Sequence, residues 1–464
     1  MREIKPFVLV GLPLAFQIAT GFPSVDARDL PFSPGEGKVA VSVVTDTTLQ
    51  FFPGGPHVPR VATSIHSLDG TRLLLITPDQ VNQADSSEIV TAVEPAAFSP
   101  DGKRIAITAW HGGYRTFILD EGKSRPICVT CSLSKKGKRF DRERQQICWS
   151  PGGDRLAVCN SYEGDETISV FEGDSLRLLV GRSGGGSLSR GLEMTWLKDR
   201  TAFLAIQHSG GNSQLIKIPV GGAESGSAGP RSRSRGGTWE ILSSSGGRIS
   251  GIAWNPARDT LAFTVGPKLY LFYDEGAHQT FTAPSHYQSI SWSTDGKRLS
   301  LYDGSRGEIL IVQRDGQNPW NATEEMRDKG PIPNVVWLDA QKFAFIVVRP
   351  RHDGARLFCG DAVAKTVTEV VSKNLVSTKL QTIEDGVLLF KIRSRGHWSQ
   401  VPKRLDTPAH RSRKVKIDLC YWSPRNSITR LTTGAFETEE AEGEYAISYD
   451  PVFWVKQKEL DARE

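Results

Sequence analysis

The sequence predicts an all-β protein, a β-propeller of four-stranded blades, with eight blades preferred and seven as the alternative. Three observations predict this fold: a repeated turn motif, the spacing between its copies, and a composition rich in turn residues. The 464 residues include 45 Gly and 26 Pro but only 3 Met, which favours many short strands over long helices. A chain of this length forms either several domains or one large repeat array.

The repeated motif is an aromatic residue followed by a Ser/Pro/Asp/Gly turn and an apolar run. Asp-Gly accepts the positive φ of a tight hairpin, and a preceding Pro fixes φ at the start of the turn. We expect the aromatic residue to end the innermost strand of a blade and to pack against the neighbouring sheet. The clear copies are Phe98–Ala106, Trp149–Ala157, Trp254–Ala262 and Trp292–Leu299, and the weaker ones are Ser67–Gly70, Trp196–Asp199, Trp337–Asp339 and Glu384–Gly386.

The spacing of the copies suits one blade per copy. Adjacent copies start 32 to 58 residues apart, and a four-stranded blade takes about 40–50 residues. The first interval is short, so residues 28–60 are expected to add strands that complete or close the ring. A closed ring is favoured over a linear array because closure leaves no exposed sheet edge. The aligned starts are His66, Phe98, Trp149, Trp196, Trp254, Trp292, Trp337 and Thr382.

The clearest copies resemble the blade signature of TolB-like periplasmic propellers. That signature also occurs in the non-catalytic propeller domains of prolyl-oligopeptidase-type enzymes. The resemblance is carried by F-S-P-D-G-K-R-I-A-I-T-A at residues 98–109 and by W-S-T-D-G-K-R-L-S-L at residues 292–301, within a propeller expected over 61–435. It implies a propeller fold and a binding role in the cell envelope.

The two ends of the chain differ from the repeats. Residues 1–27 place a short basic region before an apolar run, and small residues precede a cleavage position at Arg28, as in a signal peptide. We therefore expect a periplasmic or secreted protein that contacts the membrane only during export; an uncleaved anchor or a buried strand is the alternative. Residues 436–464 are expected to form an acidic tail, disordered over 437–444, with a last strand over 445–455.

Basic residues are gathered in connections between strands. The net charge of +5 is a mild excess that does not indicate a nucleic-acid-binding protein. Two basic connections are expected on the same face of the disc, where they would attract an acidic protein or an anionic envelope polymer. Solvated loops without a partner are the alternative, and we expect a monomer. The residues of this basic face are Lys135, Lys136, Arg139, Arg393, Arg395, Arg411 and Arg413.

No motif indicates catalysis clearly. Gly181–Gly185 matches G-x-S-x-G, but the Gly- and Ser-rich run after it is not helical, and a nucleophile elbow requires a helix. His111, His208, His352 and His397 follow second strands of repeats and share one face. They could bind a metal if they converged, but turns far from the ring axis keep them apart. We expect a non-catalytic scaffold without a cofactor; the alternative is a propeller enzyme, a metal-dependent lyase or hydrolase acting on carbohydrate at the channel mouth.

The six cysteines suit an exported protein that forms disulfides. Cys128 and Cys131 form a C-x-x-C pair on a predicted strand, not at the start of a helix where a redox pair usually lies. We therefore expect structural thiols or one local disulfide. Cys359 and Cys420 recur at similar places in successive repeats and are expected to be too far apart to bridge.

Overall fold

The computed structural model describes most strands of the ring, some of them by their backbone alone. The described residues are 37–50, 57–84, 90, 92–110, 114–123, 125–131, 146–162, 165–172, 177–184, 195–197, 202–209, 212–220, 240–245, 249–257, 259–273, 276–282, 286–287, 289–326, 330, 332, 334–348, 355–375, 380–383, 386–401, 410–434, 436–441 and 452–455. The expected signal peptide, residues 1–27, lies outside them. Within these ranges no helix has both the length and the apolar character needed to cross a membrane.

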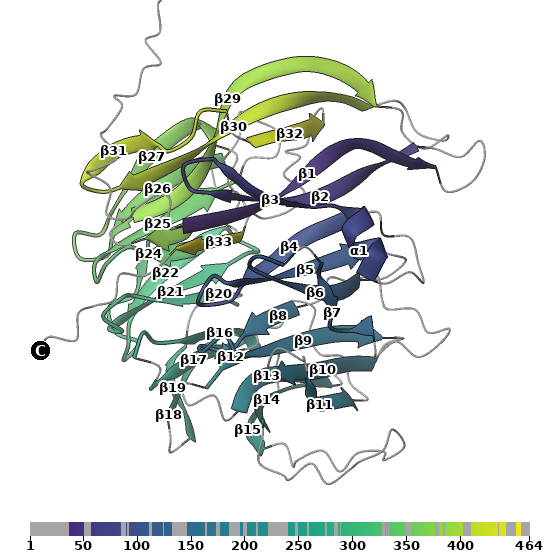
Figure 1. The fold of residues 1–464 in the computed structure, drawn as a ribbon. Coiled ribbons are helices and arrows are strands. Elements are labelled where there is room, and N and C mark those ends of the chain that lie inside the picture. The colour runs from purple at the N-terminus through teal and green to yellow at the C-terminus, as the bar shows by residue number, and fades with distance from the viewer. Residues whose placement is uncertain are drawn as a thin grey trace, which may run out of the picture.

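The protein is a β-propeller, in which small antiparallel sheets follow one another around a ring (Figure 1). Four of the sheets have four strands each. The first two contain β8 (Gln146–Trp149), β9 (Arg155–Tyr162), β10 (Asp165–Glu172) and β11 (Arg177–Gly184), then β12 (Thr195–Trp196), β13 (Ala202–Ser209), β14 (Asn212–Pro219) and β15 (Glu240–Ser245). The next two contain β16 (Ile249–Trp254), β17 (Leu261–Val265), β18 (Lys268–Tyr273) and β19 (Gly276–Thr282), then β20 (Ser289–Trp292), β21 (Arg298–Asp303), β22 (Glu308–Gln313) and β23 (Trp320–Asn321).

A nine-stranded sheet contains two further groups of four strands, joined by the single pair Leu375–Lys391. The first group is β24 (Val335–Trp337), β25 (Lys342–Val347), β26 (Ala355–Asp361) and β27 (Thr366–Leu375). The second group is β28 (Gln381–Ile383), β29 (Gly386–Val401), β30 (His410–Ser423) and β31 (Asn426–Arg430). An added strand, β32 (Phe436–Ala441), pairs with the outer part of β30.

An eight-stranded sheet is built from both ends of the chain. One group contains β4 (Ala92–Phe98), β5 (Arg104–Trp110), β6 (Tyr114–Asp120) and β7 (Ile127–Cys128). The other contains, in spatial order, β33 (Val452–Val455), β1 (Gly37–Gln50), β2 (His57–Ser67) and β3 (Arg72–Ile76), and the one helix of the described chain, α1 (Pro78–Ala84), follows it. Because β33 pairs with β1, this closing blade joins the end of the chain to its beginning.

When the nine-stranded sheet is divided between β27 and β29 and the eight-stranded sheet between β2 and β4, the described strands fall into eight groups of four with β32 left over. That grouping fits the preferred eight blades, although the blade number itself stays a prediction. One expected repeat is misplaced: the turn Ser67–Gly70 joins β2 to β3, the last two strands of the closing blade, and does not follow an innermost strand. Asp-Gly can occur in both hairpin turns on one face of a blade, as at Asp295–Gly296 and Asp315–Gly316 in β20–β23, so the short motif does not distinguish them.

The innermost strands of successive groups lie next to one another, and tryptophans join them. The indole nitrogen of a tryptophan ending one innermost strand donates to a carbonyl of the preceding innermost strand. This occurs from Trp149 to Ala97 O (3.2 Å), from Trp196 to Cys148 O (3.1 Å), from Trp292 to Ala253 O (2.9 Å) and from Trp337 to Ser291 O (3.2 Å). The apolar cores also lie between groups, since one cluster unites Ala157, Trp196 and Phe263. Each blade is therefore stabilised by its neighbours.

The Ser-Pro-Asp-Gly turn is held by its own side chains. Buried Ser99 donates from Oγ to Asp101 Oδ1 (2.5 Å) and accepts from the amide of Arg104 (2.9 Å), while the amide of Gly102 donates to Ser99 O (2.9 Å). Gly102 has φ of 67°, a conformation that costs glycine little and other residues more. The bonds recur at Ser293, which explains why this motif repeats in the sequence.

Candidate functional site

Two hairpins extend well beyond the ordinary blade. In β24–β27 the second and third strands have 6 and 7 residues, whereas β29 and β30 have 16 and 14. In the closing blade, β1 and β2 have 14 and 11 residues. Both hairpins connect a second strand to a third strand, so they project from the same face of the ring, with β32 between them (Figure 1). We call β1, β2, β29, β30 and β32 together the hairpin platform.

The half of the β29–β30 hairpin that lies nearest the ring is part of the propeller core. Leu388, Phe390, Leu419 and Tyr421 are buried and pack with Val39 of β1 in one cluster. Beyond Ile417 the composition changes, and the remaining residues of β30 read H-R-S-R-K-V-K from 410 to 416. The apolar half fixes the base of the hairpin, while the basic half extends from the ring.

The structure brings part of the predicted basic face together on this outer half. Arg411 pairs with Gln400, Arg413 pairs with Trp398, and Arg395 pairs with Val415 in the β29–β30 ladder. Arg393 lies at the register shift between Ile392 and Ser394. Lys135, Lys136 and Arg139 lie outside the described residues, so their place on this face stays a prediction.

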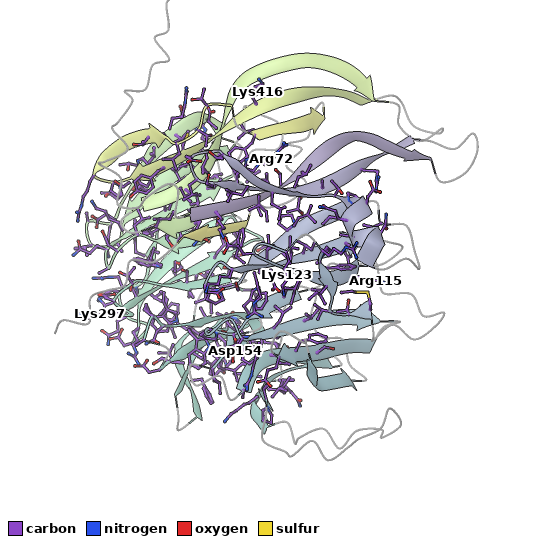
Figure 2. The ribbon with its side chains drawn as sticks, in the orientation of Figure 1. Arg72, Arg115, Lys123, Asp154, Lys297 and Lys416 are labelled. Carbon is purple, nitrogen blue, oxygen red and sulfur yellow. A yellow bond between two sulfur atoms is a disulfide. The ribbon has the colours of Figure 1, made fainter. Side chains whose placement is uncertain are left out.

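Acidic residues of β32 lie directly opposite the basic residues of β30. Lys416 pairs with Glu437, Lys414 with Glu439 and Arg413 with Glu440. Oppositely charged residues at paired positions of a sheet attract each other. Residues 437–441 were expected to be disordered; they form a strand instead, because the neighbouring basic strand offers both backbone partners and opposite charge. Lys416 is exposed on the hairpin (Figure 2).

The base of β32 is anchored in the core. Phe436 is 4% exposed, and its ring lies 4.8 Å from the ring of His66 and 5.3 Å from that of Phe390. Just before the strand, the amide of Gly434 donates to the buried carboxylate of Asp418. The strand is therefore held firmly at one end, and its acidic residues run outward along β30.

The other hairpin is fixed to helix α1 and to the core. Arg60 of β2 donates to both carboxylate oxygens of Asp79 at 2.9 and 2.6 Å, and this contact lowers the pKa of Asp79. Deeper in β2, burial lowers the pKa of His66, whose ring contacts Ser64 Oγ (2.7 Å) and Gly70 O (3.2 Å). A neutral, buried histidine with both nitrogens engaged has a structural role here.

The predicted metal-binding histidines stay untested. His111 and His352 lie outside the described residues, and for His208 in β13 and His397 in β29 only the backbone is described. In the part of the chain whose side chains are placed, no group of three or more His, Cys, Asp or Glu residues could hold a metal ion. The site that the described residues build is a charged surface on the hairpin platform.

The class of protein follows from this geometry: a β-propeller with an elaborated face. No known protein family model matches the chain, and no curated protein matches it. Among solved structures the chain is similar to dihydro-heme d1 dehydrogenase NirN in complex with DHE, with a TM-score of 0.53 and 12% identity over 90% of this chain and 77% of that chain. This likeness shows the propeller fold.

Two other solved structures are similar at lower TM-scores. One is TolB from Acinetobacter baumannii, with a TM-score of 0.35 and 13% identity over 72% of this chain and 80% of that chain. The other is oligogalacturonate lyase in complex with manganese, with a TM-score of 0.42 and 12% identity over 76% and 94%. Likenesses at these TM-scores carry no argument, and the activity is argued from the site itself.

Proposed function

We propose that this propeller is a non-catalytic scaffold of the cell envelope, periplasmic or secreted, that binds an acidic partner protein on its hairpin platform. The observation that carries the proposal is the outer half of the β29–β30 hairpin. It extends beyond the ring and carries Arg395, Arg411, Arg413 and Lys416 at paired positions of one β29–β30 ladder. A rigid base with projecting charged strands suits recognition of another chain.

The kind of partner is argued from β32. At the outer end of β30 the chain's own neighbour is a strand in which Glu437, Glu439 and Glu440 face basic residues across the ladder. A ligand that matches this surface carries alternating carboxylates on an extended backbone. A protein segment supplies both features, whereas an anionic polymer supplies only charge, so we favour a protein with an acidic extended segment.

The test compares two variants of equal net charge in capture experiments from solubilised envelope of the source cells. The platform variant replaces Arg393, Arg395, Arg411 and Arg413 by Ser. The matched control replaces Arg72, Lys103, Lys297 and Lys365 by Ser; these four are exposed in or directly beside turns on the opposite face. Surface positions such as these contribute little to stability, so both variants should fold.

We expect one dominant protein to be captured by the parent chain and the control, and to be lost from the platform variant. Raising the salt concentration should weaken the capture, because exposed charges are screened. Equal capture by both variants, or capture that is insensitive to salt, would rule out this face. Capture of an anionic polymer without a protein would contradict the proposed partner class.

A further inference from the structure

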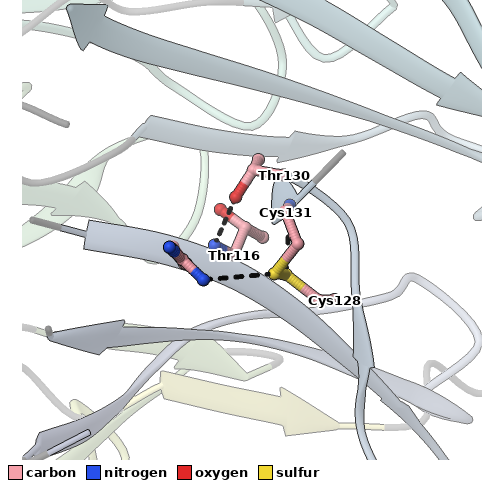
Figure 3. Close-up of a disulfide and its surroundings, with 5 residues drawn as sticks. Thr116, Cys128, Thr130 and Cys131 are labelled. Carbon is pink, nitrogen blue, oxygen red and sulfur yellow. Dashed lines mark hydrogen bonds between the residues drawn. A yellow bond between two sulfur atoms is a disulfide. The ribbon is translucent and has the colours of Figure 1, made fainter. Parts of the chain in front are cut away.

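The Cys128–Cys131 disulfide lies at the rim of the ring, on the outermost strand of its group. Strand β7 ends at Cys128, and both cysteines are partly exposed. Figure 3 shows the bridge beside β6, close to Thr116 and Thr130. A small reactant could therefore approach the sulfur atoms from solvent.

The chain around this disulfide is held by other contacts. Cys128 pairs with Phe117 in the β6–β7 ladder, the amide of Val129 donates to Thr116 O (2.9 Å), and the amide of Thr116 donates to Thr130 Oγ1 (3.0 Å). Val129 and Thr130 are buried. The bridge spans a sequence separation of three residues, and disulfides that close short loops stabilise a fold least. Breaking the bridge should therefore leave the segment in place, with the two sulfur atoms still adjacent.

The sulfur atoms also lie beside donors that favour a thiolate. Arg115 Nη1 lies 3.8 Å from Cys131 Sγ, and the amide of Cys131 donates to Cys128 Sγ at 3.1 Å (Figure 3). A thiolate is stabilised by a neighbouring arginine or by an amide dipole, and a stabilised thiolate is a good leaving group in exchange. The guanidinium of Arg115 thus supplies the positive environment that a helix start supplies in other C-x-x-C pairs.

We propose that Cys128 and Cys131 form a thiol–disulfide exchange site that reacts with small thiols or exposed protein thiols. An incoming thiolate attacks Cys128 Sγ, the Cys128–Cys131 bond breaks, and Cys131 leaves as a thiolate beside Arg115. A second thiolate attacks the incoming sulfur of the mixed disulfide and releases Cys128. Two thiols are oxidised to one disulfide, and the protein disulfide is reduced to two thiols.

Two of the other four cysteines are poorly suited to exchange. Burial raises the pKa of the Cys359 thiol to about 11, and Cys420 is 2% exposed. Buried thiols in apolar surroundings are poor nucleophiles. Exchange is therefore expected at the rim pair and not at these two positions.

The experiment uses the full chain in glutathione buffers of graded ratio, quenched with acid, with each cysteine followed by peptide mass spectrometry. We expect reversible reduction of the Cys128–Cys131 bond with the thermal midpoint of the ring little changed, and a glutathione adduct on Cys128 when Cys131→Ser is used. Arg115→Gln should slow reduction about tenfold, and Arg115→Lys should retain most of the rate. A large fall in the thermal midpoint on reduction, or an unchanged rate in folded Arg115→Gln, would overturn the proposal.

A second measurement covers the case in which Arg115→Gln does not fold. The disulfide of the wild-type protein is reduced, and alkylation of Cys131 is followed from pH 5 to pH 9 beside that of Cys148, a partly exposed thiol outside any disulfide. Alkylation of Cys131 at pH values where Cys148 does not react supports the site. The same pH dependence for both thiols would refute it.

Discussion

Replacing Trp292 by Phe tests the hydrogen bonds that join neighbouring blades. The indole nitrogen of Trp292 donates to Ala253 O at 2.9 Å, and the residue is 7% exposed. Phenylalanine keeps an aromatic ring at the end of the innermost strand but removes the donor from the Ala253 carbonyl. The hydrogen bond is partly buried, so the loss of its donor costs about 1 kcal/mol of the free energy of unfolding, and the smaller ring also packs less tightly against the neighbouring sheet.

Trp254 is the matched control, because it ends an innermost strand in the same way. Its indole nitrogen is buried and has no hydrogen-bond partner among the described residues. Trp254→Phe removes the same ring atoms, but it also removes a buried unsatisfied donor that itself costs about 1–3 kcal/mol. Trp292→Phe should therefore be less stable than Trp254→Phe by at least about 2 kcal/mol.

Equilibrium urea unfolding followed by far-UV circular dichroism measures this difference. The two variants should share one slope with denaturant concentration, so that the separation of their midpoints reports stability alone. Equal destabilisation would refute the reasoning, because it would mean that ring packing alone joins the blades. A lower stability for Trp254→Phe would show that its indole nitrogen has a partner in solution.

The remaining predictions concern a thiol, a turn and a glycine. Burial raises the pKa of the Cys359 thiol to about 11, so its alkylation by iodoacetamide should be slow at pH 8 and accelerate toward pH 11. The contribution of this thiol to stability should fall as pH rises above its unfolded pKa near 9.0. Alkylation at pH 8 as fast as in the unfolded chain would contradict this prediction. Burial acts to raise the pKa of Asp295, but hydrogen bonds from Ser293 and the amide of Lys297 outweigh it and lower that pKa. Asp295→Asn should therefore lower the thermal midpoint at pH 7, with the difference lost as pH falls below about 4; a difference that persists at low pH would argue against the carboxylate. A Cβ added at Gly360 would overlap the buried ring of Phe343, so Gly360→Ala should cost about 1–3 kcal/mol in urea unfolding, and a wild-type midpoint would show that the ring moves freely.

Much of the fold could be predicted because most blades are formed by one continuous stretch of sequence with its own turn motif. The motifs expected at Trp254–Ala262 and Trp292–Leu299 form the turns from β16 to β17 and from β20 to β21, and the TolB-like resemblance correctly indicated a propeller. Misplacing the Ser67–Gly70 turn has a physical cause. The amide of Gly70 donates to Ser67 O at 3.0 Å, and the amide of Gly102 donates to Ser99 O at 2.9 Å, so the two turns have the same chemistry in different hairpins.

The candidate site was predicted less completely, because charge in a sequence does not say which strand lies opposite. Arg395, Arg411 and Arg413 were selected as an exposed basic group, whereas Lys416 and the acidic strand β32 were not. A signal was present in the alternation of Lys414 and Lys416 on one strand and of Glu437 and Glu439 on the other. Their pairing depends on the path of the chain through β31 and residues 431–434 and on the anchor at Phe436, which only the folded chain reveals.

The way in which the ring closes has a consequence for how the protein is made. Strand β33 comes from residues 452–455 and completes a blade that begins at residue 37. A chain that is synthesised or translocated from its N-terminus therefore cannot form this pairing until residues 452–455 have arrived. Until then the edge of β1 at Gly37–Ala40 lacks its partner strand, and an open edge invites pairing with other chains and attack by proteases. A chain cut short before residue 452 therefore remains an open ring with an unpaired edge at β1.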